Sequence, residues 1–125
     1  MGNAAIKQMI EYIEAGDFPA EFSARDLGLD EFAENTGLPI IKMMYDAFSG
    51  SIDAAMEVHE ALLLRWPWAI KSSATGGFQA WTNHALGLRG LGYTGWTPSH
   101  PARAWLIAIL RALDDTDQHE GGSNG

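Results

Sequence analysis

WPWAIKSSATGGFQAW, residues 66–81, is the stretch that decides the fold, because the spacing of apolar residues changes there from a helical period to a period of two. Trp66, Trp68 and Ile70 alternate with smaller or polar residues, which is typical of a strand with one buried face. The turn residues SSATGG then allow residues 78–82 to return antiparallel. The stretch therefore predicts a β-hairpin with Trp66 and Trp68 on its inner face, where replacing either by alanine would cost about 3–5 kcal/mol if the side chain is fully buried.

Helical patterns flank the hairpin on both sides. Residues 52–64 follow Ser51, a good N-cap, and carry apolar side chains on one stripe, while residues 101–113 form a wide apolar face. A third short strand is expected near Tyr93. Further helices are expected over residues 4–15, 30–35 and 39–48. This order predicts an α+β fold in which a small antiparallel β-sheet of two or three strands is layered between α-helices, with a helical N-terminal segment.

Length and composition indicate one domain. The chain has 125 residues, of which 46% are hydrophobic, enough to build a core without metals or disulfides. We expect this domain to span residues 1–115, as a helical acidic segment over 1–50 and a helix-hairpin-helix core over 51–115, and residues 116–125 to be disordered. The lack of cysteine excludes thiol catalysis, and no stretch has the form of a membrane span or a signal peptide. A cytoplasmic protein without a cofactor is therefore expected.

The net charge of −8 comes from residues 1–50, which contain three basic and nine acidic residues, and from the acidic tail after residue 113. Such a surface favours a basic protein partner, for example a host protein that binds nucleic acid, and a solvated acidic face is the simpler alternative. Direct nucleic-acid binding is disfavoured, because the helix-turn-helix-like segment around Gly37 offers Lys42 as its one cation. The candidate protein-binding residues are Glu21, Asp26, Asp30, Glu31 and Glu34.

A second candidate site lies in the glycine-rich segment between Asn83 and Arg103. Arginine offers a fork of donors, aromatic rings offer stacking faces and the start of the last helix offers a positive dipole, a combination suited to a small anionic ligand such as a nucleotide. An ordinary surface loop is the alternative, because no phosphate-binding fingerprint is present. Trp81 is expected either to close the core or to open onto this segment. The candidate ligand-binding residues are Trp81, His84, Arg89, Tyr93, Trp96, His100 and Arg103.

No group of residues predicts catalysis or metal binding. His59 and Glu60 are adjacent and therefore diverge on a helix, and no carboxylate motif connects His84 with His100. His59 lies on the apolar stripe and is expected to be a hydrogen-bonded core residue. Because no nucleophile motif or paired acid and base is present, the chain is expected to act by binding rather than as an enzyme, with self-assembly through a sheet edge or helix face as a further alternative.

Three motifs in one order carry a resemblance to a known family: GSIDAAMEVHEALL at residues 50–63, the WPW that opens the hairpin, and HPARAWLIAILRAL at residues 100–113. Over about residues 50–115 the chain resembles small phage and prophage proteins described as having a phage ABA-sandwich domain, although Leu64-Arg65 replaces the usual Pro-Gly after the first helix. The resemblance implies α/β/α layering and a phage or prophage origin, and it supplies no catalytic residues. It makes an accessory protein that antagonises a host defence system the leading functional hypothesis.

Overall fold

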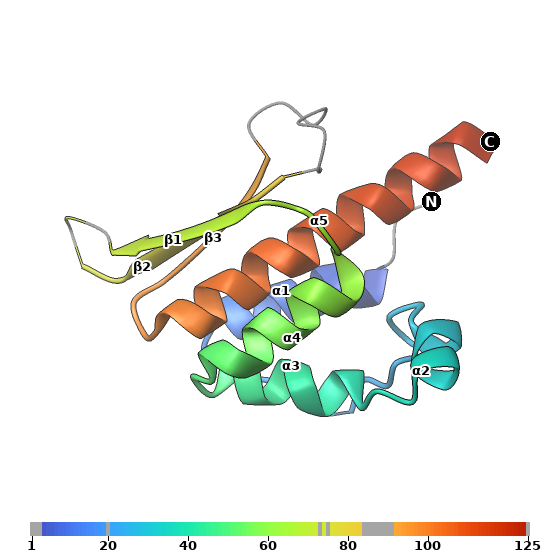
Figure 1. The fold of residues 1–125 in the computed structure, drawn as a ribbon, viewed down its shortest axis with the longest axis horizontal. Coiled ribbons are helices and arrows are strands. Elements are labelled where there is room, and N and C mark those ends of the chain that lie inside the picture. The colour runs from blue at the N-terminus through green and yellow to red at the C-terminus, as the bar shows by residue number, and fades with distance from the viewer. Residues whose placement is uncertain (1–3, 20, 73, 75, 84–91, 125) are drawn as a thin grey trace.

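The computed structural model describes residues 4–19, 21–72, 74, 76–83 and 92–124, with side chains described as far as residue 115. Within these residues, five helices and three strands form an α+β fold with a helical N-terminal segment, as predicted (Figure 1). The helices are α1 (Ala4–Glu14), α2 (Asp30–Thr36), α3 (Ile40–Phe48), α4 (Ile52–Leu62) and α5 (Pro101–Asn124). The strands are β1 (Trp68–Ser72), β2 (Phe78–Thr82) and β3 (Tyr93–Thr97).

Local sequence signals explain how the helices begin and which faces they bury. The hydroxyl oxygen of Ser51 accepts a hydrogen bond from the backbone N–H of Ala54 at 3.1 Å, so Ser51 caps α4 as predicted. α1 buries the stripe expected for it, which consists of Ile6, Met9, Ile10 and Ile13. These side chains pack into the core, and the polar residues of α1 lie on its solvent-exposed face.

The three strands form one antiparallel sheet in the order β1–β2–β3. Ile70, Ala80 and Gly95 are register partners on the face that packs against α5. At Gly95 the helix lies directly on the strand, because a Cβ there would overlap the carbonyl oxygen of Ala104 and would lie 2.8 Å from the backbone nitrogen of Ala108. The close contact between β3 and α5 therefore requires glycine at position 95, because any larger residue would add a Cβ there.

α5 forms the middle layer of the molecule. Residues 104–110, AWLIAIL, are all fully buried, and a helix that is apolar on every side is stable only where other elements surround it. The sheet covers one side of α5, and α1, α3 and α4 cover the other (Figure 1). The layer order thus differs from the expected one in one respect, since the described helices lie on one face of the sheet and its other face is left partly exposed.

The predicted burial of Trp66 and Trp68 is incomplete. Trp66 precedes β1 and is half-buried, and Trp68 remains 42% exposed although its ring centroid lies 4.2 Å from that of Trp105. β1 is an edge strand, so its side chains lack a neighbouring strand on one side. The two-residue alternation therefore predicted which face of the sheet Trp68 occupies, but not how far its side chain is buried.

α5 is longer than predicted. The sequence predicts an end near Leu113, whereas the backbone of α5 runs from Pro101 to Asn124. The disorder expected for residues 116–125 stays a prediction. Despite this length, no helix in the described part of the chain is both long and apolar enough to cross a membrane.

Candidate functional site

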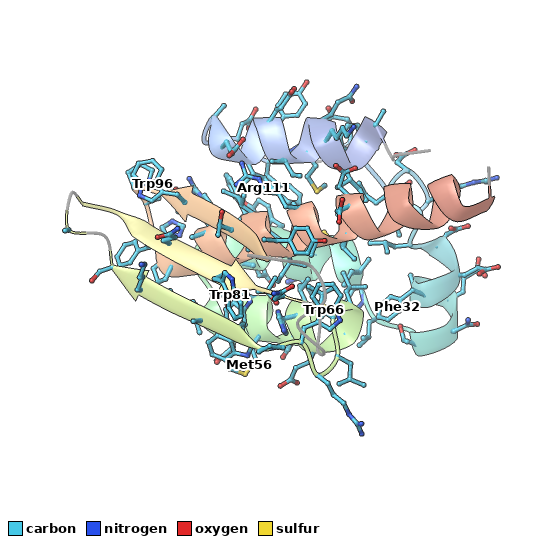
Figure 2. All side chains as sticks on the ribbon, turned by 90° about the horizontal axis from the view of Figure 1, so that it is seen from above. Phe32, Met56, Trp66, Trp81, Trp96 and Arg111 are labelled. Atoms are coloured by element: carbon cyan, nitrogen blue, oxygen red, sulfur yellow. The ribbon has the colours of Figure 1, made fainter. Side chains whose placement is uncertain are left out.

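Trp81 lies on the outer face of the sheet, away from α5 (Figure 2). Its register partners Ala69 and Thr94 share this face, and the indole is half-buried. The side chains enclose a hollow of about 240 Å³ that spans all three strands. The hollow is lined by Ala69, Lys71, Gln79, Trp81 and Thr94. Of the two expectations for Trp81, the structure thus supports an outward-facing ring.

Trp96 shares the outer face with Trp81, whereas Tyr93 does not. Trp96 is 49% exposed, and both tryptophans are visible from above the sheet in Figure 2. Tyr93 points to the inner face, where its ring stacks on Trp66 with centroids 6.2 Å apart and its hydroxyl donates to the Asp115 carboxylate. Tyr93 therefore ties the sheet to α5 and is removed from the predicted ligand site.

His100 and Arg103 belong to a structural junction at the start of α5. The Arg103 Nε donates to the carbonyl oxygen of Phe48 at 3.0 Å, and its guanidinium carbon lies 3.9 Å from the Phe48 ring centroid. The His100 ring packs on Gly50, and burial together with the charge of Arg103 lowers the pKa of His100. Both residues join α5 to the turn between α3 and α4. These contacts account for the chemistry of Arg103, whereas the Nδ1 of His100 is buried without a hydrogen-bond partner among the described residues.

The predicted ligand site is therefore divided. Trp81 and Trp96 lie on the outer sheet face, Tyr93 on the inner face, and His100 and Arg103 at the start of α5. His84 and Arg89 lie outside the described residues. Sequence reasoning missed Lys71 and Gln79, although the same two-residue alternation that turns Trp68 and Ile70 inward places them on the face of Trp81.

His59 is a core residue, as predicted. It is 2% exposed, and its Nε2–H donates to the Trp66 carbonyl oxygen at 2.8 Å. The Trp105 Nε1–H donates to its Nδ1 at 3.2 Å, which assigns the neutral tautomer because an indole nitrogen can only donate. Burial lowers the pKa of His59, against smaller raising effects of the Trp66 carbonyl and of Glu60. The neutral imidazole thus joins α4, the start of β1 and α5.

We expect this network to make stability depend on pH. Because the folded-state pKa of His59 lies below the unfolded value of 6.5, the unfolded chain takes up the proton first, so the contribution of His59 is complete above about pH 6.5 and is lost as the pH falls through the folded pKa. The free energy of unfolding should drop by up to about 1.4 kcal/mol for each pH unit in that window.

Urea denaturation at about pH 7.5 and about pH 5.5 measures this effect before most carboxylates titrate. His59→Gln keeps an N–H donor for the Trp66 carbonyl and removes the titration, so its stability should change less between the two pH values. The pKa of His100 is also lowered, but its contribution is the same in both proteins. Equal pH dependence of wild type and variant would contradict the assignment.

The five acidic residues predicted to bind a protein are all exposed. Asp26 is partly engaged, because its carboxylate accepts hydrogen bonds from the backbone N–H and the hydroxyl of Ser23 at 2.9 and 3.2 Å. α2 has no buried residue, and Phe32 is a half-buried side chain that packs against the core. The five candidates are Glu21, Asp26, Asp30, Glu31 and Glu34, and Glu11, Glu14 and Asp17 of the N-terminal part are exposed as well.

A groove between α3 and α4 lies next to this acidic surface and was not predicted. It has a volume of about 500 Å³, and Leu64 in its wall is 67% exposed. We call it the α3/α4 groove, lined by Leu38, Met43, Glu57, Glu60, Ala61 and Leu64. The sequence signal was the run Leu62-Leu63-Leu64 at the end of α4, which is longer than one helical stripe can bury.

Metal binding and relationships with known proteins give no further guide to function. Among the described residues, no group of three or more histidine, aspartate or glutamate side chains could hold a metal ion. No protein-family model matches the chain, and comparisons with curated proteins and with solved structures give no match. The resemblance of residues 50–115 to phage ABA-sandwich proteins therefore stays a prediction.

Proposed function

We propose that this chain is a non-enzymatic binding protein that engages a basic segment of another protein through its helical side. The observation that carries this is the α3/α4 groove. Its apolar lining, which includes Met43, Ala61 and Leu64, lies beside two carboxylates, Glu57 and Glu60. Leu38 and Leu64 in its lining are exposed large apolar side chains, and apolar side chains that gather in a hollow can bind a partner. The flanking carboxylates select a partner that combines apolar and cationic side chains.

The charge around the groove supports the same partner. Residues 17–64 contain ten carboxylates and two cations, and one of these cations, Lys42, is bound to Asp46 at 3.1 Å. A surface with this excess attracts cationic segments over a distance of about 10 Å at moderate ionic strength. The exposed acids of α2 contribute to this field, because Leu38 in the groove wall follows α2 directly in the chain.

The shape of the groove favours a helix as the bound segment. Two packed helices leave a furrow between them, and an amphipathic helix can lay its apolar face in such a furrow. Lysine or arginine side chains on the edge of that helix would then pair with Glu57 and Glu60. This arrangement explains why Leu64 remains exposed at the end of α4.

The resemblance of residues 50–115 to phage and prophage proteins supports a bacterial host protein as the partner. A host protein that binds nucleic acid carries a basic surface, and an acidic phage protein can occupy that surface in place of the phosphate backbone. Antagonism of a host defence system in the cytoplasm is the purpose that we propose. Such a protein needs affinity and no chemistry of its own.

Binding of a labelled probe tests the groove. A fluorescein-labelled amphipathic peptide with lysine and leucine at helical spacing should bind the wild-type protein, as measured by fluorescence anisotropy. Glu57→Lys together with Glu60→Lys should weaken binding by about tenfold, and Leu64→Asp by a similar factor, because each removes one half of the recognition. Higher salt should weaken binding to the wild type.

Asp53→Lys is the matched control, because Asp53 is exposed on the same helix and does not line the groove. It should change the affinity by less than about threefold. The double variant Glu31→Lys with Glu34→Lys changes the charge of α2 and leaves the groove lining intact. It should weaken binding by a factor between those of Asp53→Lys and of the Glu57/Glu60 double variant. Equal binding by all variants would refute the groove as the site.

A further inference from the structure

The stretch that contains the sheet differs in charge from the acidic residues that precede it. Residues 65–113 contain five lysines and arginines and no aspartate or glutamate, although the whole chain has a net charge of −8. All three strands lie within this stretch. Lys71 is the one charged residue within the three strands, so an anionic ligand would meet a cation and no carboxylate of the strands there, in contrast to Glu57 and Glu60 at the α3/α4 groove.

The outer sheet face combines several kinds of side chain around one hollow. Two cross-strand rows meet there: Lys71, Gln79 and Trp96 in one, and Ala69, Trp81 and Thr94 in the other. The small Ala69 beside the large Trp81 indole leaves the hollow of about 240 Å³. Its walls thus supply an aromatic ring, the ammonium of Lys71, the amide of Gln79 and the hydroxyl of Thr94.

These groups match the parts of a nucleotide. An indole stacks on a planar base, an amide both donates and accepts hydrogen bonds at the edge of a base, and an ammonium pairs with phosphate. Sites that enclose a drug-sized molecule have volumes of roughly 300–1,000 Å³, and this hollow is smaller. It can therefore hold one ring system of a ligand, whose other groups would lie on the open face of the sheet. We propose that the outer sheet face binds a nucleotide unit, with its base on Trp81 and its phosphate at Lys71.

Trp96 extends the site beyond one base. It is the diagonal neighbour of Trp81 on the adjoining strand, a position about 7–8 Å away on one sheet face, and its side chain is 49% exposed. A second base next to the first would stack there, as bases do on aromatic platforms of sheets. Trp96 therefore distinguishes a nucleotide within a single strand from a free nucleotide.

The other cations of this stretch that the structure describes around α5 have different roles. Arg111 donates to the carbonyl oxygen of Thr94 at 2.7 Å and to the Glu14 carboxylate at 2.6 Å, which covers the free edge of β3. Arg103 is held by Phe48. Lys71 is exposed and lines the hollow, so it is the cation on which the phosphate contact depends.

Two ligands test this inference on the full chain. Adenosine monophosphate is titrated by calorimetry, and a fluorescein-labelled single strand of about ten thymidines is titrated by anisotropy. Lys71→Glu should weaken binding of both ligands by at least about tenfold, and Trp81→Ala by about five- to hundredfold. Trp96→Ala should weaken binding of the oligonucleotide and leave that of the mononucleotide unchanged if the natural ligand is a single strand.

Lys7→Glu is the matched control, because Lys7 is exposed on α1 and the charge change is the same. It should leave both affinities within about twofold. Glu57→Lys with Glu60→Lys should likewise leave nucleotide binding unweakened, so this site and the α3/α4 groove succeed or fail separately. Because Lys71 is exposed, Lys71→Glu should fold normally, so it tests the site even if Trp81→Ala fails to fold.

Tighter binding of the oligonucleotide with a steep salt dependence would support a single-stranded nucleic acid, and binding of the mononucleotide alone would support a free nucleotide. The absence of binding by both ligands up to about 1 mM would overturn the inference. Binding that Lys71→Glu leaves unchanged would overturn it as well.

Discussion

Gly95→Ala is expected to lower the free energy of unfolding by at least about 3 kcal/mol. The new Cβ would overlap the carbonyl oxygen of Ala104 and would lie 2.8 Å from both the backbone nitrogen of Ala108 and the Cβ of Ile107. These are backbone and core atoms of a fully buried helix, so they cannot move aside without separating α5 from β3. Urea denaturation followed by far-UV circular dichroism measures the change.

Thr94→Ala is the matched control for this substitution. Thr94 adjoins Gly95 in β3 but faces the opposite side of the sheet, where it is exposed. Its replacement should cost less than about 1 kcal/mol, because it leaves the contact with α5 unchanged. A similar loss for both variants would mean that strand propensity, and not the approach of α5, makes Gly95 necessary.

Trp105→Ala is expected to cost about 3–5 kcal/mol. Trp105 is fully buried in the middle layer, its ring centroid lies 4.2 Å from that of Trp68, and its Nε1–H donates to the Nδ1 of His59. Alanine leaves a cavity and also leaves a buried acceptor without a donor, which places the cost in the upper part of that range. The same denaturation experiment measures it.

Two further variants separate these contributions. Trp105→Phe keeps most of the ring volume and removes the N–H, so it should cost about 1–3 kcal/mol for the lost hydrogen bond. Trp96→Ala removes a tryptophan from the exposed outer face and should cost less than about 1 kcal/mol. If Trp96→Ala were as damaging as Trp105→Ala, the outer face would be part of the core and could not serve as a ligand site.

The secondary structure was largely predictable from local patterns. The apolar stripe of α1, the Ser51 cap of α4 and the two-residue alternation through Trp68 and Ile70 each depend on neighbouring residues alone. The core position of His59 followed from its place on an apolar stripe. The full extent of α5 did not follow, because the polar residues after Leu113 carry no apolar period.

The candidate sites depended on contacts between distant segments. Arg103 and Tyr93 have side chains suited to ligand binding, yet one is bound to Phe48 and the other to Asp115. Their partners lie 55 and 22 residues away, beyond the reach of any local pattern. The α3/α4 groove likewise exists only because two helices pack side by side.

The sequence by itself determined the class of fold, the sheet-forming stretch and the separation of acidic from basic segments, because periodicity and charge are properties of residues close together in the chain. The tertiary structure alone decided that α5 occupies the middle layer, with the sheet on one side and the other helices on the opposite side. That arrangement places the described helices on one face of the sheet and turns Trp81 toward the other. The physical reason is that residues 104–110 are apolar all round, so the free energy of burying them is gained only when separate elements enclose the helix from both sides.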